Sequence, residues 1–186
     1  MSLPAVGFPR ARAVPPALAR AAAPFDIALR WARDGDRPAL LALYATTRAE
    51  ELAAQPWPEA SRAQFVAQQC DLQHRHFVAH YADAEFLVLV RGPEVVGRLY
   101  VDRSARAPRD LVVDILLAPA WRGAGVGGAL LRGVQADAVA RGREVELHVL
   151  AWNLGARRLY ERLGFHVADA GSPHVLMRWA APPPVS

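Results

Sequence analysis

The stretch that decides the fold runs from Leu111 to Val134 and reads LVVDILLAPAWRGAGVGGALLRGV. Its first seven residues, 111–117, form a short apolar run of the kind that makes a buried strand. Pro119 and the glycines that follow then interrupt the chain. From Val126 onward, apolar residues recur at helical spacing, at positions 126, 130, 131 and 134. The pattern predicts a strand that turns through glycines into a helix.

The glycine turn has the properties of an anion-binding loop. The first amides of the predicted helix have no intrahelical partner, and the helix dipole adds partial positive charge there. Small residues at Gly123, Gly125 and Gly127 let an anion approach the backbone closely. Arg122 adds a charged, forked donor. Three alternating glycines behind an arginine exceed what a tight turn requires, so the segment predicts a phosphate or pyrophosphate site.

Three kinds of phosphate loop share this physics, and the surrounding residues separate them. A Walker-type loop needs a lysine, and this chain contains none. A dinucleotide-binding loop, G-x-G-x-x-G, also needs an acidic residue at the end of the next strand, and the predicted strand 145–150 lacks one. The third pattern, R-x-x-G-x-G, is met by Arg122, Gly125 and Gly127. With this motif the chain resembles the GNAT superfamily of N-acetyltransferases, whose loop binds the pyrophosphate of acetyl-CoA.

A second segment carries the same resemblance. Residues 153–165, NLGARRLYERLGF, fit the superfamily pattern N-x-x-A-x-x-x-Y-x-x-x-G-F. The residues also predict a helix independently of the resemblance, because Asn153 is a favourable N-cap and Gly164 stands where a left-handed helix terminator belongs. The resemblance covers roughly Asp26 to Trp179 in layout, but its strong motifs lie only in residues 111–165.

The resemblance implies an α/β fold. We expect a central mixed, mostly antiparallel sheet with helices on both faces, in which strands 111–117 and 145–150 form a splayed parallel pair. The other expected elements are a strand at 25–31, helices from residue 36 and over 59–80, a hairpin of 86–90 with 95–101, and final strands at 165–168 and 174–179. We expect one domain over residues 25–179. The Pro/Ala/Arg-rich segment 1–24 and the tail 180–186 are predicted to be disordered.

The resemblance also implies an enzyme that moves an acetyl group from acetyl-CoA to a primary amine by direct attack in a ternary complex. Tyr160 matches the tyrosine that protonates the departing thiolate, although a tyrosine beside Leu159 and Leu163 could instead serve packing. A non-catalytic acetyl-CoA-binding module on the same fold is the alternative, and the presence of Tyr160 argues against it. The positions that match cofactor contacts are Leu116, Leu117, Arg122, Gly123, Gly125, Val126, Gly127, Asn153 and Ala156.

Two residues are candidates for the general base. His148 lies at a strand position where some members of the superfamily carry a glutamate that receives the proton of the amine, and histidine suits that task near neutral pH. Asp114 is the rival, because a carboxylate within an apolar strand is costly unless it is paired or functional. Asp114 could instead orient His148 or simply bond backbone amides, and His148 could simply be hydrogen-bonded at the sheet surface. If neither residue is the base, a chain of water molecules would carry the proton.

The predicted helix 59–80 carries Cys70, His74, His76 and His80, which invite a metal interpretation. At 100° per residue, Cys70 and His74 lie on one side of the helix and the other two nearly opposite, so one metal cannot bind all four. We therefore expect no metal. Because a helix at this place covers the acceptor site in the superfamily, Gln69, His76 and His80 are weak candidates for the acceptor pocket.

Composition limits the remaining classes of function. The net charge is +4, of which residues 1–24 contribute +3, leaving +1 for the rest of the chain and little field to attract nucleic acid. No apolar run reaches the length of a membrane span. The single cysteine suits a reducing compartment, so a cytoplasmic location is expected. The expected partner is a small-molecule or peptide amine, and a homodimer is compatible with the sequence.

Overall fold

The computed structural model describes residues 6–105 and 108–182. Within these ranges one seven-stranded sheet has the order β1-β2-β3-β4-β5-β7-β6, and every neighbouring pair is antiparallel except the parallel pair β4–β5. The strands are β1 Ala28–Trp31, β2 Glu85–Arg91, β3 Glu94–Asp102, β4 Arg109–Leu117, β5 Glu144–Leu150, β6 His166–Asp169 and β7 His174–Trp179. The α-helices are α1 Pro16–Ala22, α2 Arg37–Ala53, α3 Glu59–His80, α4 Val126–Ala140 and α5 Leu154–Arg162. The expected fold class is confirmed.

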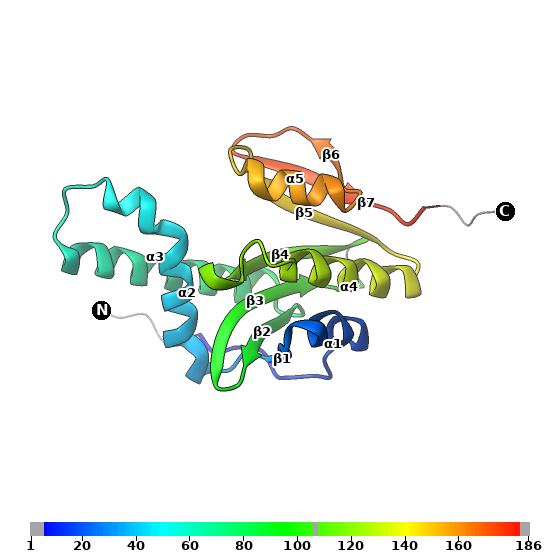
Figure 1. The fold of residues 1–186 in the computed structure, drawn as a ribbon, viewed down its shortest axis with the longest axis horizontal. Helices are drawn as coiled ribbons and strands as arrows, with labels where there is room; N and C mark the ends of the chain where they lie inside the picture. The colour runs from blue at the N-terminus through cyan, green and yellow to red at the C-terminus, as the bar shows by residue number, and fades with distance from the viewer. Residues whose placement is uncertain (1–5, 106–107, 183–186) are drawn as a thin grey trace.

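Helices cover both faces of the sheet (Figure 1). Helices α1, α4 and α5 pack on one face, which we call the cofactor face, and bury the larger hydrophobic core there. Helices α2 and α3 pack on the other face, which we call the α2–α3 face, over two smaller clusters. Both faces of the central strands are therefore shielded, as their continuous apolar sequences require.

The parallel strands β4 and β5 separate along their length (Figure 1). Their pairing runs from Arg109 opposite Glu144 to Val112 opposite Leu147 and then stops, although both strands continue. The cause lies in β4, where the register against β3 jumps so that Val113 is an extra residue between two paired positions. Such a bulge bends its strand and increases the local twist. The splayed pair expected from the sequence is thus present, and its opening begins at the bulge.

The structure corrects the expectation for residues 1–24. Residues 1–5 lie outside the described part, but Pro16–Ala22 form α1, in which Leu18 and Ala22 are fully buried. Helix α1 packs so closely on α4 that a Cβ placed on Gly133 would lie 3.1 Å from the carbonyl oxygen of Ala17. The ordered domain therefore begins before residue 25. A seven-residue helix with a two-residue apolar stripe gives too little periodicity to be recognised in the sequence.

The ends of the expected domain also differ in detail. The first strand begins at Ala28 rather than residue 25, because Ala23–Phe25 form a 3₁₀ turn and Asp26 adopts a left-handed conformation with φ 56°. At the other end, residues 180–182 belong to no helix or strand, and 183–186 lie outside the described part.

Candidate active site

A cavity of about 550 Å³ opens where β4 and β5 diverge. The end of β4, the glycine turn, the first turn of α4 and one side of α5 form its wall. Eight of the residues singled out in the sequence line it, which brings both motifs into one site: Leu116, Leu117, Arg122, Gly123, Gly125, Gly127, Ala156 and Tyr160.

The first turn of α4 presents backbone amides to this cavity. Gly123 and Gly125 have φ of 76° and 89°, values that favour glycine, and Gly125 is the N-cap residue. Among residues 6–105 and 108–182, no side chain caps this end of the fifteen-residue helix, so within these ranges its N-cap position offers the first amides no side-chain acceptor. Val126, whose side chain is fully buried, anchors the turn in the core. Uncapped amides beside glycine backbone fit the pyrophosphate of acetyl-CoA.

Arg122 joins the glycine turn to two other elements. Its Nε donates to the carbonyl oxygen of Leu117 at 2.9 Å, and its Nη2 donates to the hydroxyl of Thr46 in α2 at 2.6 Å. The side chain is exposed and lines the cavity. Because a guanidinium has five N–H groups, these two bonds leave donors for an anion in the cavity.

Tyr160 reaches the cavity from α5 and is only 8% exposed. Burial, followed by the charge of Asp114, raises the pKa of its phenol to about 12. The phenol is therefore fully protonated at neutral pH and can act as a proton donor. Its ring lies 6.0 Å from that of Phe165, so the packing role considered for this tyrosine coexists with the position in the cavity.

Asp114 lies on the α2–α3 face, next to the start of the splay. Its Oδ2 accepts a 2.6 Å hydrogen bond from Nε of Arg98, and Nη2 of Arg98 donates to Gln73 of α3 at 2.7 Å. Within the described residues only Oδ2 of Asp114 is bonded, which leaves Oδ1 for another donor. The carboxylate is 21% exposed, and its charge contributes to the raised pKa of Tyr160, although Asp114 does not line the cavity.

His148 lies on β5 across the splay from Asp114. Its neighbours Leu147 and Val149 point into the core of the cofactor face, so His148 points to the other face, where it is exposed. Neither His148 nor Asp114 lines the cavity that holds Tyr160. The two candidate bases thus share a face of the sheet, but only Asp114 has a charge that is felt at Tyr160.

Asn153 serves as the N-cap of α5, since its Oδ1 accepts from the amide of Ala156 at 3.1 Å. The cavity also contains residues that sequence reasoning missed. They share one face of α5 or the inner side of β4 and α4: Ile115, Gly128, Leu131, Gly155, Leu159 and Arg162. The spacing of 155, 159 and 162, which repeats at helical intervals around Ala156, was the signal that could have identified Arg162.

The histidines of α3 do not converge. Nε2 of His74 donates to the carbonyl oxygen of Val6 at 2.8 Å, whereas the rings of His76 and His80 contact each other elsewhere on the helix, with centroids 4.2 Å apart. In the described ranges no group of three or more His, Cys, Asp or Glu side chains is arranged to hold a metal ion. No helix in those ranges is long and apolar enough to span a membrane.

Known proteins resemble this chain in sequence and in fold. The model of the acetyltransferase (GNAT) family matches residues 40–165. A mycothiol acetyltransferase from Corynebacterium glutamicum is 36% identical over 91 residues, which are 48% of this chain and 31% of that relative. The chain therefore matches about a third of the length of this curated relative.

Solved structures agree on the fold. The PaiA N-acetyltransferase of Thermoplasma acidophilum, determined with coenzyme A, has a TM-score of 0.64 at 16% identity, covering 83% of this chain and 99% of that one. An acetyltransferase from Thermus thermophilus has a TM-score of 0.61 at 18% identity, covering 82% and 96%. The family match over most of the chain, the shared fold and the two motifs around one cavity show that this protein belongs to the GNAT family of acetyltransferases.

Proposed function

We propose that this protein transfers an acetyl group from acetyl-CoA to a primary amine of a small molecule or peptide, by direct attack within a ternary complex. One observation carries the proposal: the uncapped first turn of α4, the splayed end of β4 and the buried phenol of Tyr160 meet in a single cavity. Acetyl-CoA requires an anion-binding backbone at its pyrophosphate and a proton donor at its thioester sulfur.

The glycine turn with Arg122 would hold the pyrophosphate, and the arm of the cofactor would lie in the splay beside Leu116 and Leu117. The amine nitrogen attacks the thioester carbonyl, the carbon–sulfur bond breaks, and Tyr160 gives its proton to the departing thiolate. Holding both reactants in one site supplies much of the rate by orientation. Asn153, which caps α5 beside Ala156, would position the helix that carries Tyr160.

Asp114 is the base that the geometry favours over His148. The amine loses a proton as it attacks, and the acceptor of that proton must be within hydrogen-bond reach, directly or through one water. In the part of the chain that the structure describes, one oxygen of Asp114 has no hydrogen-bond donor, the other is held by Arg98, and the charge of the carboxylate acts on Tyr160. His148 is exposed beyond the splay and would serve only through water.

Binding of acetyl-CoA tests the proposal directly. At a concentration one hundred times Kd, a ligand stabilises a protein by about 2.7 kcal/mol, which raises Tm by several degrees for a chain of this size. Arg122→Ala should weaken the binding of CoA more than that of pantetheine, which lacks the pyrophosphate. Arg158→Ala, which removes an exposed arginine of α5 outside the cavity, is the matched control. The proposal fails if the folded protein shows no thermal shift with millimolar acetyl-CoA.

A further inference from the structure

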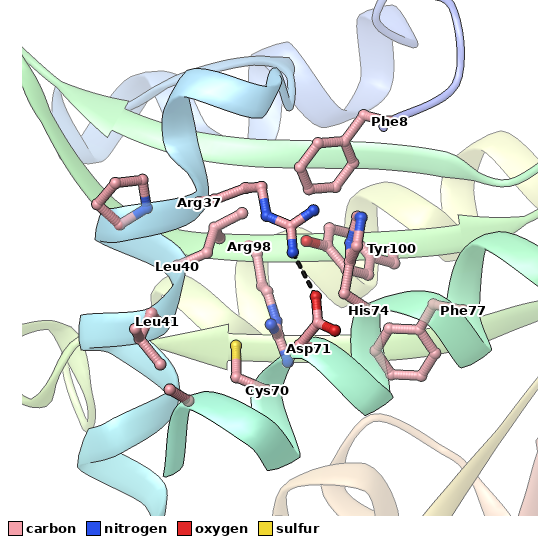
Figure 2. Close-up of a pocket in the computed structure, with 12 residues that line it drawn as sticks. Phe8, Arg37, Leu40, Leu41, Cys70, Asp71, His74, Phe77, Arg98 and Tyr100 are labelled. Carbon is pink, nitrogen blue, oxygen red and sulfur yellow. Dashed lines mark hydrogen bonds and ion pairs between the residues drawn. The ribbon is translucent and has the colours of Figure 1, made fainter. Parts of the chain in front are cut away.

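A second cavity, of about 310 Å³, lies on the α2–α3 face (Figure 2). Its wall is formed by helices α2 and α3, by strand β3 and by Phe8, which lies in the segment that precedes α1. It shares no lining residue with the cofactor cavity, which opens on the opposite side of the sheet. Its apolar lining includes Leu40, Phe77 and the ring of Tyr100.

A buried cation forms one end of this cavity. Arg98 is 4% exposed, and its guanidinium stands 5.3 Å from the centre of the Tyr100 ring. Of its five N–H groups, one bonds Asp114 and one bonds Gln73, and the hydroxyl of Tyr100 is a further hydrogen-bond partner of the guanidinium. Arg98 lines the cavity, and the N–H groups that these partners leave are available to a ligand there. This end of the cavity therefore favours a carboxylate, which a guanidinium can bind through two parallel hydrogen bonds.

The opposite rim already holds an oxygen acceptor. The carbonyl oxygen of Val6 accepts from Nη1 of Arg37 at 2.9 Å and lies 2.8 Å from Nε2 of His74. Burial lowers the pKa of His74, so its ring is neutral at pH 7 and donates through Nε2. Arg37 is held in place by Asp71 on α3 (Figure 2).

Residues 6–8 close the cavity as a strap. The amide of Phe8 donates to Oδ1 of Asp34 at 3.0 Å, and its ring packs edge-on against His74 with centroids 4.6 Å apart. A second edge contact, at 5.8 Å, joins the ring to Phe86 in the sheet. The strap is thus held by a few contacts at the rim, whereas the rest of the wall consists of helices and a central strand.

We propose that this cavity binds a small carboxylate with an apolar body and that residues 6–8 are its lid. The carboxylate would bond the spare N–H groups of Arg98, and the apolar body would lie against Leu40, Phe77 and Tyr100. Of the charged side chains that line the cavity, two are arginines and one is Asp71, which is already bonded to Arg37. This cavity shares Arg98 with the proposed acetyl transfer, because the same guanidinium holds Asp114, but binding of a carboxylate can be measured without any acetyl transfer.

The chain contains its own reporter for this site. Cys70 is the only cysteine and lines the cavity beside Arg98. Burial raises the pKa of its thiol, so alkylation at neutral pH is slow and depends on access. The rate at which iodoacetamide modifies Cys70 in the full chain therefore measures whether the cavity is open, closed or occupied.

Phenylpropionate and its neutral counterpart, phenylpropionamide, are the probes. At ten times Kd the carboxylate should slow alkylation of Cys70 about tenfold, because only about one molecule in eleven remains free. The amide should protect far less at the same concentration. Ala67→Leu, which fills the cavity from α3, should abolish protection while the thermal shift with acetyl-CoA is retained. Equal protection by the amide, or none by the carboxylate at millimolar concentration, would overturn the proposed site.

The lid is tested by Phe8→Ala. Loss of the two aromatic contacts should make Cys70 react several-fold faster, in proportion to the population with an open strap. Leu72→Ala, which changes an exposed side chain two residues from Cys70, is the control and should leave the rate unchanged. An unaltered rate in Phe8→Ala, with the protein folded by circular dichroism, would show that residues 6–8 are a fixed wall instead of a lid.

Discussion

The two faces of the sheet form their sites in different ways. On the cofactor face, the cavity is built from backbone: glycines with positive φ, the uncapped amides of α4 and the open end of β4. On the α2–α3 face, the polar groups are side chains brought together from several elements, such as Arg98 from β3, Asp114 from β4 and Gln73 from α3. The difference shows that a site for a common cofactor can rest on main-chain geometry, whereas the opposite face depends on paired charges.

We expect the largest effect on turnover from Tyr160, a side chain that the cofactor face supplies. Tyr160→Phe keeps the buried ring but removes the donor, so kcat should fall by roughly 10²–10⁴-fold, the size of a general-acid contribution. The affinity for acetyl-CoA, measured by thermal shift or calorimetry, should change little. Unchanged turnover would remove the tyrosine from the mechanism. Failure of the unaltered protein to acetylate any amine in a broad panel, while binding acetyl-CoA, would favour a non-catalytic binding module.

Asp114→Asn tests the side-chain chemistry of the α2–α3 face. We expect kcat/KM to fall by about 10²-fold, at the lower end of general-base effects, without loss of acetyl-CoA binding. His148→Gln should reduce kcat/KM by much less, because His148 is exposed and only Asp114 acts electrostatically on Tyr160. A pH–rate profile of both variants decides between them. If His148→Gln has the larger effect and removes the acidic limb, the base is His148.

Gly133→Val tests how far the cofactor face depends on α1. A Cβ at this position would lie 3.1 Å from the backbone oxygen of Ala17 and 3.1 Å from Cβ of Ala21, so α1 must move. Overpacking of this kind costs about 1–3 kcal/mol, which lowers Tm by several degrees in thermal unfolding. If Gly133→Val leaves Tm unchanged, the contact of α1 with α4 contributes nothing to stability.

Gly125→Ala separates backbone strain from cofactor binding. A left-handed residue with a side chain costs about 1–3 kcal/mol, and a displaced first turn should raise the Kd for CoA about tenfold. Gly142→Ala is the matched control, because Gly142 has φ 63° at the other end of α4 and has no atom nearby that a Cβ would meet. Both variants should lose stability, but only Gly125→Ala should lose CoA affinity in calorimetry. Equal CoA affinity in the two variants would contradict the role of the turn.

The pH dependence gives the smallest expected change. With the pKa of Tyr160 raised to about 12, the phenol remains protonated as pH rises through 10, where an ordinary tyrosine is half ionised. Ionisation of the Tyr160 phenol should therefore change turnover at saturating substrate concentrations by less than twofold between pH 8.5 and 10. An alkaline limb near pH 10 that disappears in Tyr160→Phe would show that the phenol is not buried as described.

The sequence determined most of the cofactor face. The glycine loop, the helix after it and the Asn153–Phe165 motif are each contiguous, and their chemistry depends on local backbone geometry that residue type and spacing specify. Both motifs consequently line the expected cavity. The long helix 59–80, the hairpin and the splayed strand pair were also predicted, because their patterns extend over enough residues to be distinct.

Only the tertiary structure decided the rest. The pairing of Asp114 with Arg98, sixteen residues apart, and the contact of Val6 with Arg37 and His74 depend on the packing of α2, α3 and β3, which no local pattern encodes. The bulge at Val113 is likewise a matter of register between neighbouring strands. Helix α1 is too short to be stable by itself, so burial of Leu18 and Ala22 against α4 must supply the free energy that orders it.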